Sequence, residues 1–404
     1  MSFLNYEVYL QYLNLLNVNL YIMIYRVRAE QGLLVLNFDA EGYYAVDDHM
    51  NALDAYGEKG KLYVKVDSPT KYVYLIKFKE KGYPKDDVFV GNSGTLSSIQ
   101  RVNYVRVYEG EIREINGIEK VGYNEVEIRN FRGIEYGNLH LDRVNVIIGA
   151  NNAGKTTILD ALYLLSDPYQ KPPGFKNSLE LLSYLHNVKK GNKFLYRFYN
   201  TEVSPRIKGD EIEVDVSEIF SKSEEGRKEI KTLYMSYRLI PRYLKFIKEN
   251  WEEISNYIVR EIFDELNEIS NEEYLTMSLE PFAGEYTFYL IRKDGKRVRL
   301  NDIGEGVRIF IVNRILYEYL KPGLLLWDDI EAHLNPALLG KITAWFTDIP
   351  SQVVVTTHNL YVAYEISKDG KCIAVDLKNG QLKVKEIEDL KRYLDTGIDP
   401  RKIV

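Results

Sequence analysis

The fold is decided by residues 144–157, which read VNVIIGANNAGKTT. The first five residues form an apolar run that predicts a buried strand. Residues 149–156 then satisfy the pattern G-x-x-x-x-G-K-[ST] at every fixed position. Residues 156–165 continue as a helical pattern with one broad apolar face, until Pro168 ends it. This order of strand, glycine-rich loop and helix predicts an α/β fold with a phosphate-binding loop.

The loop supplies the predicted nucleotide contacts. Its glycines let the backbone wrap around a phosphate with N–H groups pointing inward, and the helix N-terminus adds partial positive charge. We expect Lys155 to reach the β- and γ-phosphates and the Thr156 hydroxyl to bind Mg²⁺, so ATP and Mg²⁺ are the expected cofactors. The predicted nucleotide-binding residues of the loop are Gly149, Ala150, Asn151, Asn152, Ala153, Gly154, Lys155, Thr156 and Thr157.

Two acids follow a second apolar run at residues 324–327. Ligands collect where the strands of an α/β sheet end at their carboxyl ends, so a metal carboxylate is expected there. We expect Asp328 to bind Mg²⁺, through water, and Asp329 to orient or deprotonate the attacking water. Many ATPases of this design have Glu at the second position, and Asp is one methylene shorter. Glu331, two residues later, is therefore the alternative base.

A third apolar run, residues 353–357, ends at His358. We predict that His358 hydrogen-bonds the γ-phosphate or the attacking water and so senses hydrolysis. The alternative is a purely structural histidine.

The segment at residues 301–306, NDIGEG, precedes an apolar-faced helix. Asn301 or Asp302 is suited to cap this helix. The two glycines, Gly304 and Gly306, leave the first N–H groups of the helix uncovered, so they are available to an anion. An ordinary capped helix is the alternative.

Composition bounds the class of protein. The chain has 404 residues, which predicts two or three domains, and 45% of them are hydrophobic, enough for a real core. A net charge of −6 argues against a generally basic nucleic-acid coat, although a local basic patch is compatible with it. A single cysteine, Cys372, excludes an intrachain disulfide, and no apolar run reaches the ~20 residues of a membrane span. We expect a cytoplasmic protein without membrane contact.

Two parts are expected along the chain. Residues 1–122 predict a small β-rich module of unknown role, with one hairpin joining residues 61–66 to 72–79 and a second strand pair around Asn116-Gly117. Residues 123–404 predict the nucleotide-binding core. Within it, residues 168–280 are expected to form a mostly helical insertion, and strands are expected to return at residues 287–291 and 297–300.

These motifs, in this order, resemble the heads of ABC-type or AAA-type P-loop ATPases. They most closely resemble the overcoming-lysogenization-defect (OLD)-like branch, related to the RecF and structural-maintenance-of-chromosomes (SMC) ATPases. The resemblance rests on residues 128–134, 144–162, 302–306, 324–336 and 353–359. It implies an ABC-type ATPase head that hydrolyses ATP, with a contact from Arg132 to the nucleotide.

The resemblance also implies a dimer. Two heads would enclose ATP symmetrically, with residues 302–306 of one head facing the γ-phosphate held by the other. OLD-like nucleases add a C-terminal TOPRIM nuclease domain. The residues after His358 predict only a hairpin around Asn379-Gly380, so we expect no such domain here.

Two targets remain open for an ATP-driven switch of this kind. The first is DNA, in repair, genome maintenance or defence against invaders. A basic stretch supports it, containing Lys222, Arg227, Lys228, Lys231, Arg238, Arg242, Lys245 and Lys248. The second is an effector protein, recruited without direct nucleic-acid binding, in which case the basic stretch is simply a solvated helical face.

Overall fold

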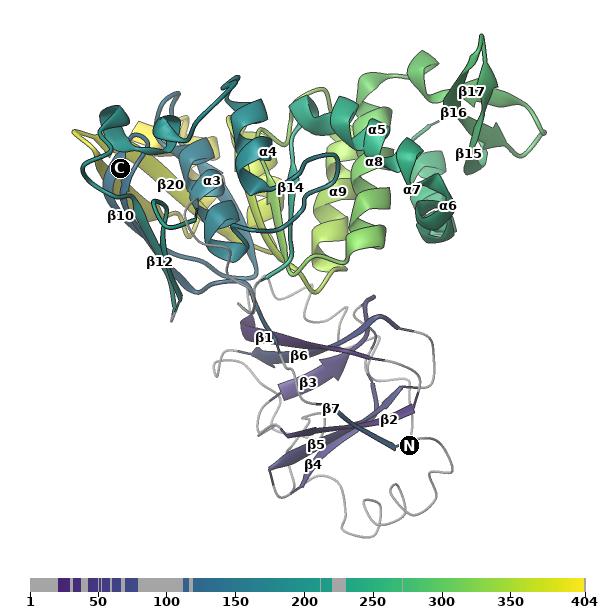
Figure 1. Ribbon diagram of the computed structural model, residues 1–404, viewed down its shortest axis with the longest axis horizontal. Helices are drawn as coiled ribbons and strands as arrows, with labels where there is room; N and C mark the ends of the chain where they lie inside the picture. Colours follow the sequence, from purple (N-terminus) through teal and green to yellow (C-terminus); the bar gives the residue numbers. More distant parts are fainter. Residues whose placement is uncertain are drawn as a thin grey trace.

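The computed structural model contains two bodies, each with its own hydrophobic core (Figure 1). The smaller core runs from Val27 to Val121 and the larger one from Tyr123 to Leu390. The structure describes residues 21–29, 32–37, 43–49, 51, 53–58, 60–66, 70–78, 112–115, 119–210, 212–219, 230–270 and 272–402.

The smaller body, the N-terminal module, consists of two four-stranded sheets with the orders β3-β6-β1-β8 and β4-β5-β2-β7. One apolar core serves both sheets, because Leu34 and Val64 of one and Val73 and Leu75 of the other belong to the same cluster. The strands are β1 (Tyr21–Arg28), β2 (Gly32–Asn37), β3 (Tyr43–Val46), β4 (Ala55–Glu58), β5 (Lys61–Val66), β6 (Tyr72–Phe78), β7 (Ile112–Ile115) and β8 (Glu119–Val121). The predicted β-rich N-terminal domain is therefore confirmed.

Both hairpins predicted in this module are wrong, although the strands themselves exist. β5 pairs with β2 and β4, whereas β6 pairs with β1 and β3 in the other sheet. Likewise β7 pairs with β2 and β8 with β1. A two-stranded hairpin leaves its apolar face uncovered, whereas two sheets that share one core cover both faces.

The larger body is built on a ten-stranded sheet with the order β13-β12-β9-β10-β21-β20-β11-β19-β18-β14. Strand β11 is parallel to its neighbours β19 and β20, and β18 is parallel to its neighbours β19 and β14. The bounds are β9 (Glu125–Phe131), β10 (Ile134–His140), β11 (Val144–Ile148), β12 (Arg206–Gly209), β13 (Ile212–Asp215), β14 (Thr232–Met235), β18 (Leu324–Trp327), β19 (Gln352–Thr357), β20 (Lys371–Lys378) and β21 (Gln381–Glu386). The α/β class is thus confirmed.

Helices pack on this sheet (Figure 1). The described helices are α3 (Lys155–Ser166), α4 (Ser178–Leu185), α5 (Ile240–Glu249), α6 (Trp251–Ile254), α7 (Arg260–Ile269), α8 (Glu305–Leu320), α9 (Pro336–Thr347), α10 (Leu360–Ser367) and α11 (Leu390–Thr396). None of them is long and apolar enough to cross a membrane.

The expectation of a mostly helical insertion at residues 168–280 needs correction. This segment does carry α4 to α7, but it also gives β12, β13 and β14 to the ten-stranded sheet. The strand β14 reads TLYM, is fully buried, and lies beside β18. The strands expected at residues 287–291 and 297–300 are confirmed as β16 (Glu285–Arg292) and β17 (Arg297–Arg299). Together with β15 (Tyr274–Phe282) they form a separate sheet.

The two bodies meet at the carboxyl end of α8. The Arg26 guanidinium of the module donates to the carbonyl oxygen of Lys321 at 2.8 Å, and the Lys71 ammonium donates to that of Tyr319 at 3.1 Å. The last carbonyls of a helix lack partners within the helix and carry partial negative charge, so cations stabilise them. The module thus caps α8.

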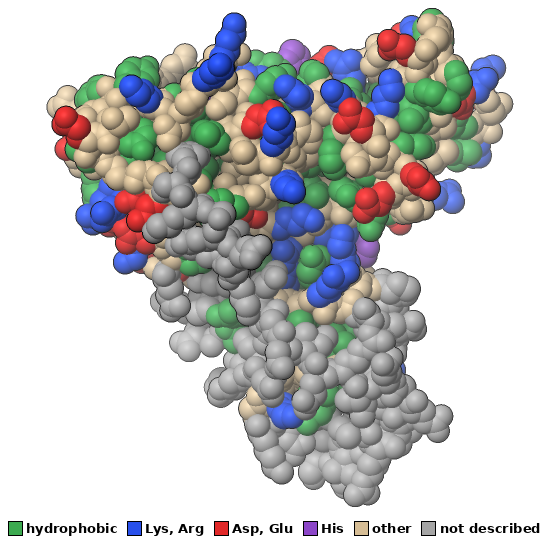
Figure 2. Space-filling model, in the orientation of Figure 1, with side chains coloured by type: hydrophobic (Ala, Val, Ile, Leu, Met, Phe, Trp, Pro, Cys, Tyr) green, Lys and Arg blue, Asp and Glu red, His purple; other side chains and the backbone are tan. Residues whose placement is uncertain are grey.

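Positive charge is concentrated at this junction, and Figure 2 shows Lys and Arg side chains gathered on the larger body next to the module. Lys231 lies half-buried just before β14, within reach of the charges of Lys71 and Arg26. Burial, together with the neighbouring charges of Lys71 and Arg26, lowers the pKa of Lys231 from 10.5 to about 8, against the opposite effect of Glu253. The charged form of Lys231 is therefore disfavoured in the folded protein.

We predict that Lys231→Met stabilises the protein at pH 7, by about 1–3 kcal/mol, because it removes a poorly compensated charge. Between pH 8 and pH 10.5, unfolding takes up a proton at Lys231. The wild type therefore gains stability as the pH rises through this window, and the difference in stability between the variant and the wild type becomes smaller. Thermal unfolding of the variant and the wild type at pH 7 and at pH 10 measures the stability difference at each pH. Lys231→Arg, which keeps the charge, is the control, and an equal gain at both pH values would contradict the prediction.

Candidate nucleotide-binding site

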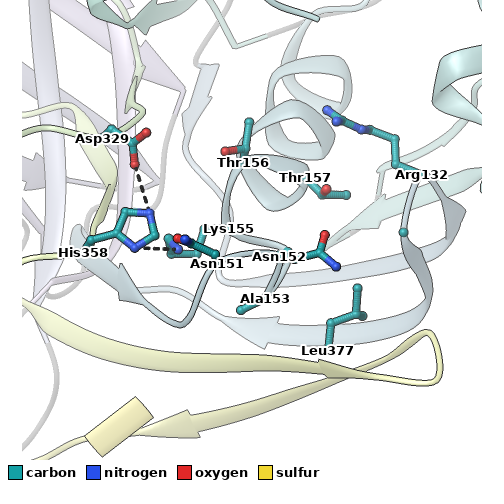
Figure 3. A pocket seen from close by; sticks show the side chains of 12 residues that line it. Arg132, Asn151, Asn152, Ala153, Lys155, Thr156, Thr157, Asp329, His358 and Leu377 are labelled. Atoms are coloured by element: carbon teal, nitrogen blue, oxygen red, sulfur yellow. Dashed lines mark hydrogen bonds and ion pairs between the residues drawn. The ribbon is translucent and has the colours of Figure 1, made fainter. Parts of the chain in front are cut away.

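Three adjacent parallel strands bring the predicted site together. The strands β11, β19 and β18 end at the same edge of the sheet, where β11 leads into the loop, β19 into His358 and β18 into Asp328. A pocket of about 400 Å³ opens there (Figure 3). The residues that line it are Arg132, Gly133, Asn151, Asn152, Ala153, Gly154, Lys155, Thr156, Thr157, Asp329, His358 and Leu377.

The loop has the shape that its glycines predict. A side chain at Gly149 would lie 2.6 Å from the carbonyl oxygen of Val375, so only glycine fits beside β20. Gly154 has φ of +93°, a left-handed angle that other residues rarely adopt, and α3 begins directly after it. Gly149 and Ala150 do not line the pocket. Instead their carbonyl oxygens each accept a hydrogen bond from the Lys155 ammonium at 3.0 Å.

The Lys155 ammonium is held at the centre of the site. It lies 3.4 Å from Nδ1 of His358. Burial lowers the pKa of Lys155, while the charges of Asp329, Asp328 and Glu331 act in the opposite direction. A phosphate group beside this ammonium would stabilise its charged form.

Asp328 is the carboxylate that fits a metal ion. Its oxygens accept from the Thr156 hydroxyl at 3.1 and 3.2 Å and from the Thr356 hydroxyl at 2.8 Å. Burial, with the neighbouring charge of Asp329, raises the pKa of Asp328 to about 6. A partly buried carboxylate beside a second acid and a hydroxyl is a set of hard oxygen donors, which suits Mg²⁺.

The described residues contain no group of three or more His, Cys, Asp or Glu side chains arranged to hold a metal ion. Mg²⁺ is usually held by one or two carboxylates together with substrate phosphates, so it would not need such a group. Asp328 and Thr156 are the residues that would hold it, and the ion would neutralise charge on the phosphates. Thr356 was not found from the sequence, where it is one of two threonines at the end of β19.

The two candidate bases lie differently. Asp329 lines the pocket, with its Oδ1 3.6 Å from Nε2 of His358 (Figure 3). Its φ is +49°, and its backbone N–H donates to the Thr356 hydroxyl at 2.9 Å. Glu331 is not among the pocket residues. Its Oε1 accepts from the backbone N–H of His358 at 2.7 Å, and its Oε2 is buried without a hydrogen-bond partner among the described residues.

His358 is held from both sides. Its ring lies between Lys155 and Asp329, and its carbonyl oxygen accepts from the Arg401 guanidinium at 3.1 Å. Arg401 belongs to the short helix η6 (Pro400–Lys402) and is itself paired with Asp399. This contact could not be predicted from the sequence, because Arg401 lies far along the chain from every motif.

Arg132 lines the pocket from the turn between β9 and β10, as the resemblance implies, but its guanidinium is already bound. It forms an ion pair with Asp160 of α3 and lies 2.5 Å from Nε2 of His186, which in turn lies 2.8 Å from the same carboxylate. The Tyr234 hydroxyl donates to the other oxygen of Asp160 at 3.3 Å. Asp160 is completely buried, so this network fixes Arg132 against the loop helix. Asp160 and His186 were not predicted from the sequence.

Gly304 lies outside the pocket of its own chain. It precedes α8 on an exposed surface, and no side chain caps the helix there. Asn301 and Asp302, the predicted caps, do not serve as caps. Asp302 instead pairs with Arg299 through two hydrogen bonds of 2.7 Å.

Two family models match the chain. Residues 123–274 match the AAA ATPase domain, and residues 217–363 match the AAA domain described as putative AbiEii toxin, Type IV TA system. Together they cover the loop, the Asp328 strand and His358.

Individual proteins are also similar. A stretch of 56 residues is 43% identical to Endonuclease GajA of Bacillus cereus (strain VD045), which is 14% of this chain and 10% of that protein. The SmcHead bound to the C-winged helix domain of ScpA is 15% identical with a TM-score of 0.44, over 68% of this chain and 99% of that one. The SMC head domain from Thermotoga maritima is 12% identical with a TM-score of 0.40, over 66% and 99%.

The family matches extend on both sides of the loop, whose glycines, lysine and threonine stand as the G-x-x-x-x-G-K-[ST] pattern requires. The phosphate-binding loop and the Asp328 carboxylate meet at one edge of the sheet, through the hydrogen bond from Thr156 to Asp328. ATP hydrolysis requires a phosphate-binding loop and a metal-binding carboxylate close together. The chain is a P-loop ATPase, and its residues 123–363 match AAA-type ATPase domains.

Proposed function

We propose that this ATPase is a nucleotide-dependent dimerising switch, in which two copies enclose Mg-ATP between them. The observation that carries the proposal is Gly304. Its φ is not in the left-handed region, and a side chain built there would meet nothing within 4 Å. Neither backbone angle nor packing within one protomer requires glycine at this position. A close approach by a second molecule is a reason for it.

The start of α8 also suits a phosphate. The helix has 16 residues, and its first N–H groups are exposed and lack a capping side chain. Such an end attracts anions. Asp302 would repel a phosphate, but its bidentate pairing with Arg299 neutralises its charge. These features support a contact between α8 of one protomer and the γ-phosphate held by the other.

For the chemistry we propose Asp329 as the base and His358 as the sensor of the γ-phosphate. Asp329 lines the pocket and is 40% exposed, so a water molecule can reach it. Glu331 instead holds the backbone of His358, and we propose that it positions the sensor. Arg132, fixed by Asp160, would present its charge to the nucleotide from the opposite side of the pocket.

For the target we propose DNA, in genome maintenance or defence, inside the cytoplasm. Similarity to a protein named endonuclease, an enzyme that cuts nucleic acid, supports this target. The basic residues that the structure describes in this stretch give the DNA target less support, because some of them are engaged within the protein. Arg242 stacks on Phe175 and Tyr184, and Lys245 pairs with Glu249. Lys222, Arg227 and Lys228 lie outside the described residues.

Because Arg242 and Lys245 already contact other side chains of the protein, a second candidate is a switch that recruits an effector protein without binding nucleic acid. The two candidates differ in their response to salt. Binding of duplex DNA by the ATP-bound protein would weaken steeply as salt rises. Binding that is absent at low salt would leave the effector protein as the target.

We predict that Lys155→Ala weakens Mg-ATP binding by roughly 10- to 150-fold, because it removes a charge-assisted contact worth about 1.5–3 kcal/mol. Isothermal titration calorimetry measures the dissociation constant. Lys391→Ala, at an exposed position of α11, is the matched control and should bind as the wild type. Unchanged binding by Lys155→Ala would remove the loop from the mechanism.

Asp329→Asn is expected to bind Mg-ATP normally but to hydrolyse it about 10²–10⁴-fold more slowly, because the base is lost. The trapped ATP should hold the protein as a dimer in sedimentation velocity. Glu331→Gln keeps a group able to accept from His358, so it should retain most activity. If Glu331→Gln traps the dimer and Asp329→Asn does not, the assignment of the base is reversed.

Gly304→Leu, placed in the Asp329→Asn protein, should abolish the ATP-induced dimer while leaving ATP affinity within about twofold. The added side chain would occupy the space where the partner approaches. Gly340→Leu is the matched control, since Gly340 is also an exposed glycine with open space around it. A dimer that survives Gly304→Leu would exclude α8 from the interface.

A further inference from the structure

Two neighbouring aromatic residues near the pocket are unusually exposed. Phe198 is 79% exposed and Tyr199 is 71% exposed. Both have left-handed backbone angles, with φ of +51° and +59°. Bulky residues rarely adopt such angles, and strain of this kind persists where the surrounding structure holds it and often has a functional reason.

The turn that carries them, residues 195–199, is anchored to the wall of the nucleotide pocket. The carbonyl oxygen of Leu195 accepts from the backbone N–H of Arg132 at 2.9 Å, and Tyr196 forms a β-bridge with Phe131. Arg197 pairs with Glu135 of β10 at 2.9 Å. The turn is therefore fixed to the residues on either side of Arg132, which lines the pocket.

The pocket has two different ends (Figure 3). Asp329 and His358 lie at one end, and Arg132 and Leu377 lie at the other. The acids and the histidine belong beside the terminal phosphate, and Lys155 lies next to them. The ribose and base of a nucleotide must then leave toward the end where Arg132 and the aromatic turn are.

We propose that Phe198 and Tyr199 form a stacking surface for the nucleobase of the bound nucleotide. The Arg197 guanidinium lies 4.4 Å from the centre of the Phe198 ring and covers one face of it. The base would stack on the uncovered aromatic surface. This inference rests on nucleotide binding at the proposed site and adds the part of that site that holds the base.

Stacking on aromatic rings tolerates different bases, because every base has a π-face. The site would therefore prefer purines to pyrimidines only modestly, through their larger stacking area. Selection of adenine would need hydrogen bonds in addition to this surface.

The test compares two probes that share the phosphates but differ in the base. Calorimetry measures the binding of Mg-ATP and of Mg-tripolyphosphate, which has no base, to the full chain. Phe198→Ala and Tyr199→Ala should each weaken ATP binding by between about five- and 150-fold and leave tripolyphosphate binding unchanged. Phe198→Tyr and Tyr199→Phe keep the rings and should restore ATP affinity.

Tyr286→Ala is the matched control, since Tyr286 is 57% exposed on β16, in a separate sheet. It should bind both probes as the wild type. Equal weakening of both probes by the Phe198 and Tyr199 variants would overturn the proposal in favour of a structural role, as would unchanged ATP affinity. Loss of the ATP-induced dimer with unchanged affinity would assign the rings to the protein interface. A wild type that binds neither probe would refute the proposed function itself.

Discussion

The site depends on the hydrogen bonds that the Asp328 carboxylate accepts from Thr156 and Thr356. These bonds join the loop helix, the Asp328 strand and the strand that leads to His358, so they fix the phosphate side against the metal side. The carboxylate is partly buried and its pKa is raised to about 6, so the site holds negative charge that is poorly compensated without a ligand. A bound metal ion and nucleotide would together supply this compensation.

The pocket has acidic groups at one end and the Arg132 guanidinium at the other. Asp329, His358 and Lys155 lie at the end where we propose that hydrolysis takes place, and Arg132 lies at the other end. Asp160 and His186 hold Arg132 in place before any nucleotide arrives. A side chain that is already oriented loses little conformational entropy on binding, so the pocket is preorganised at both ends. The loop and the acids set where phosphate can lie, and the aromatic turn lies beyond Arg132.

The sequence predicted the parts of the fold that depend on local pattern. The buried runs at β11, β18 and β19 and the loop between β11 and α3 follow from apolar residues and glycines that are adjacent in the chain. Pairing between distant strands does not follow from local pattern, which explains both wrong hairpins in the module and the unexpected place of β14 in the main sheet. Asp160 and His186 were missed for the same reason, since they meet Arg132 only in three dimensions.

The helix α8 has a consequence for how the two bodies are connected. The helix begins directly after Gly304, and the carbonyls at its other end accept hydrogen bonds from Arg26 and Lys71 of the N-terminal module. A helix of 16 residues is about 24 Å long and resists compression along its axis. A displacement of the Gly304 end along the helix axis would therefore also displace the carbonyls that Arg26 and Lys71 bind, so it would reach the N-terminal module.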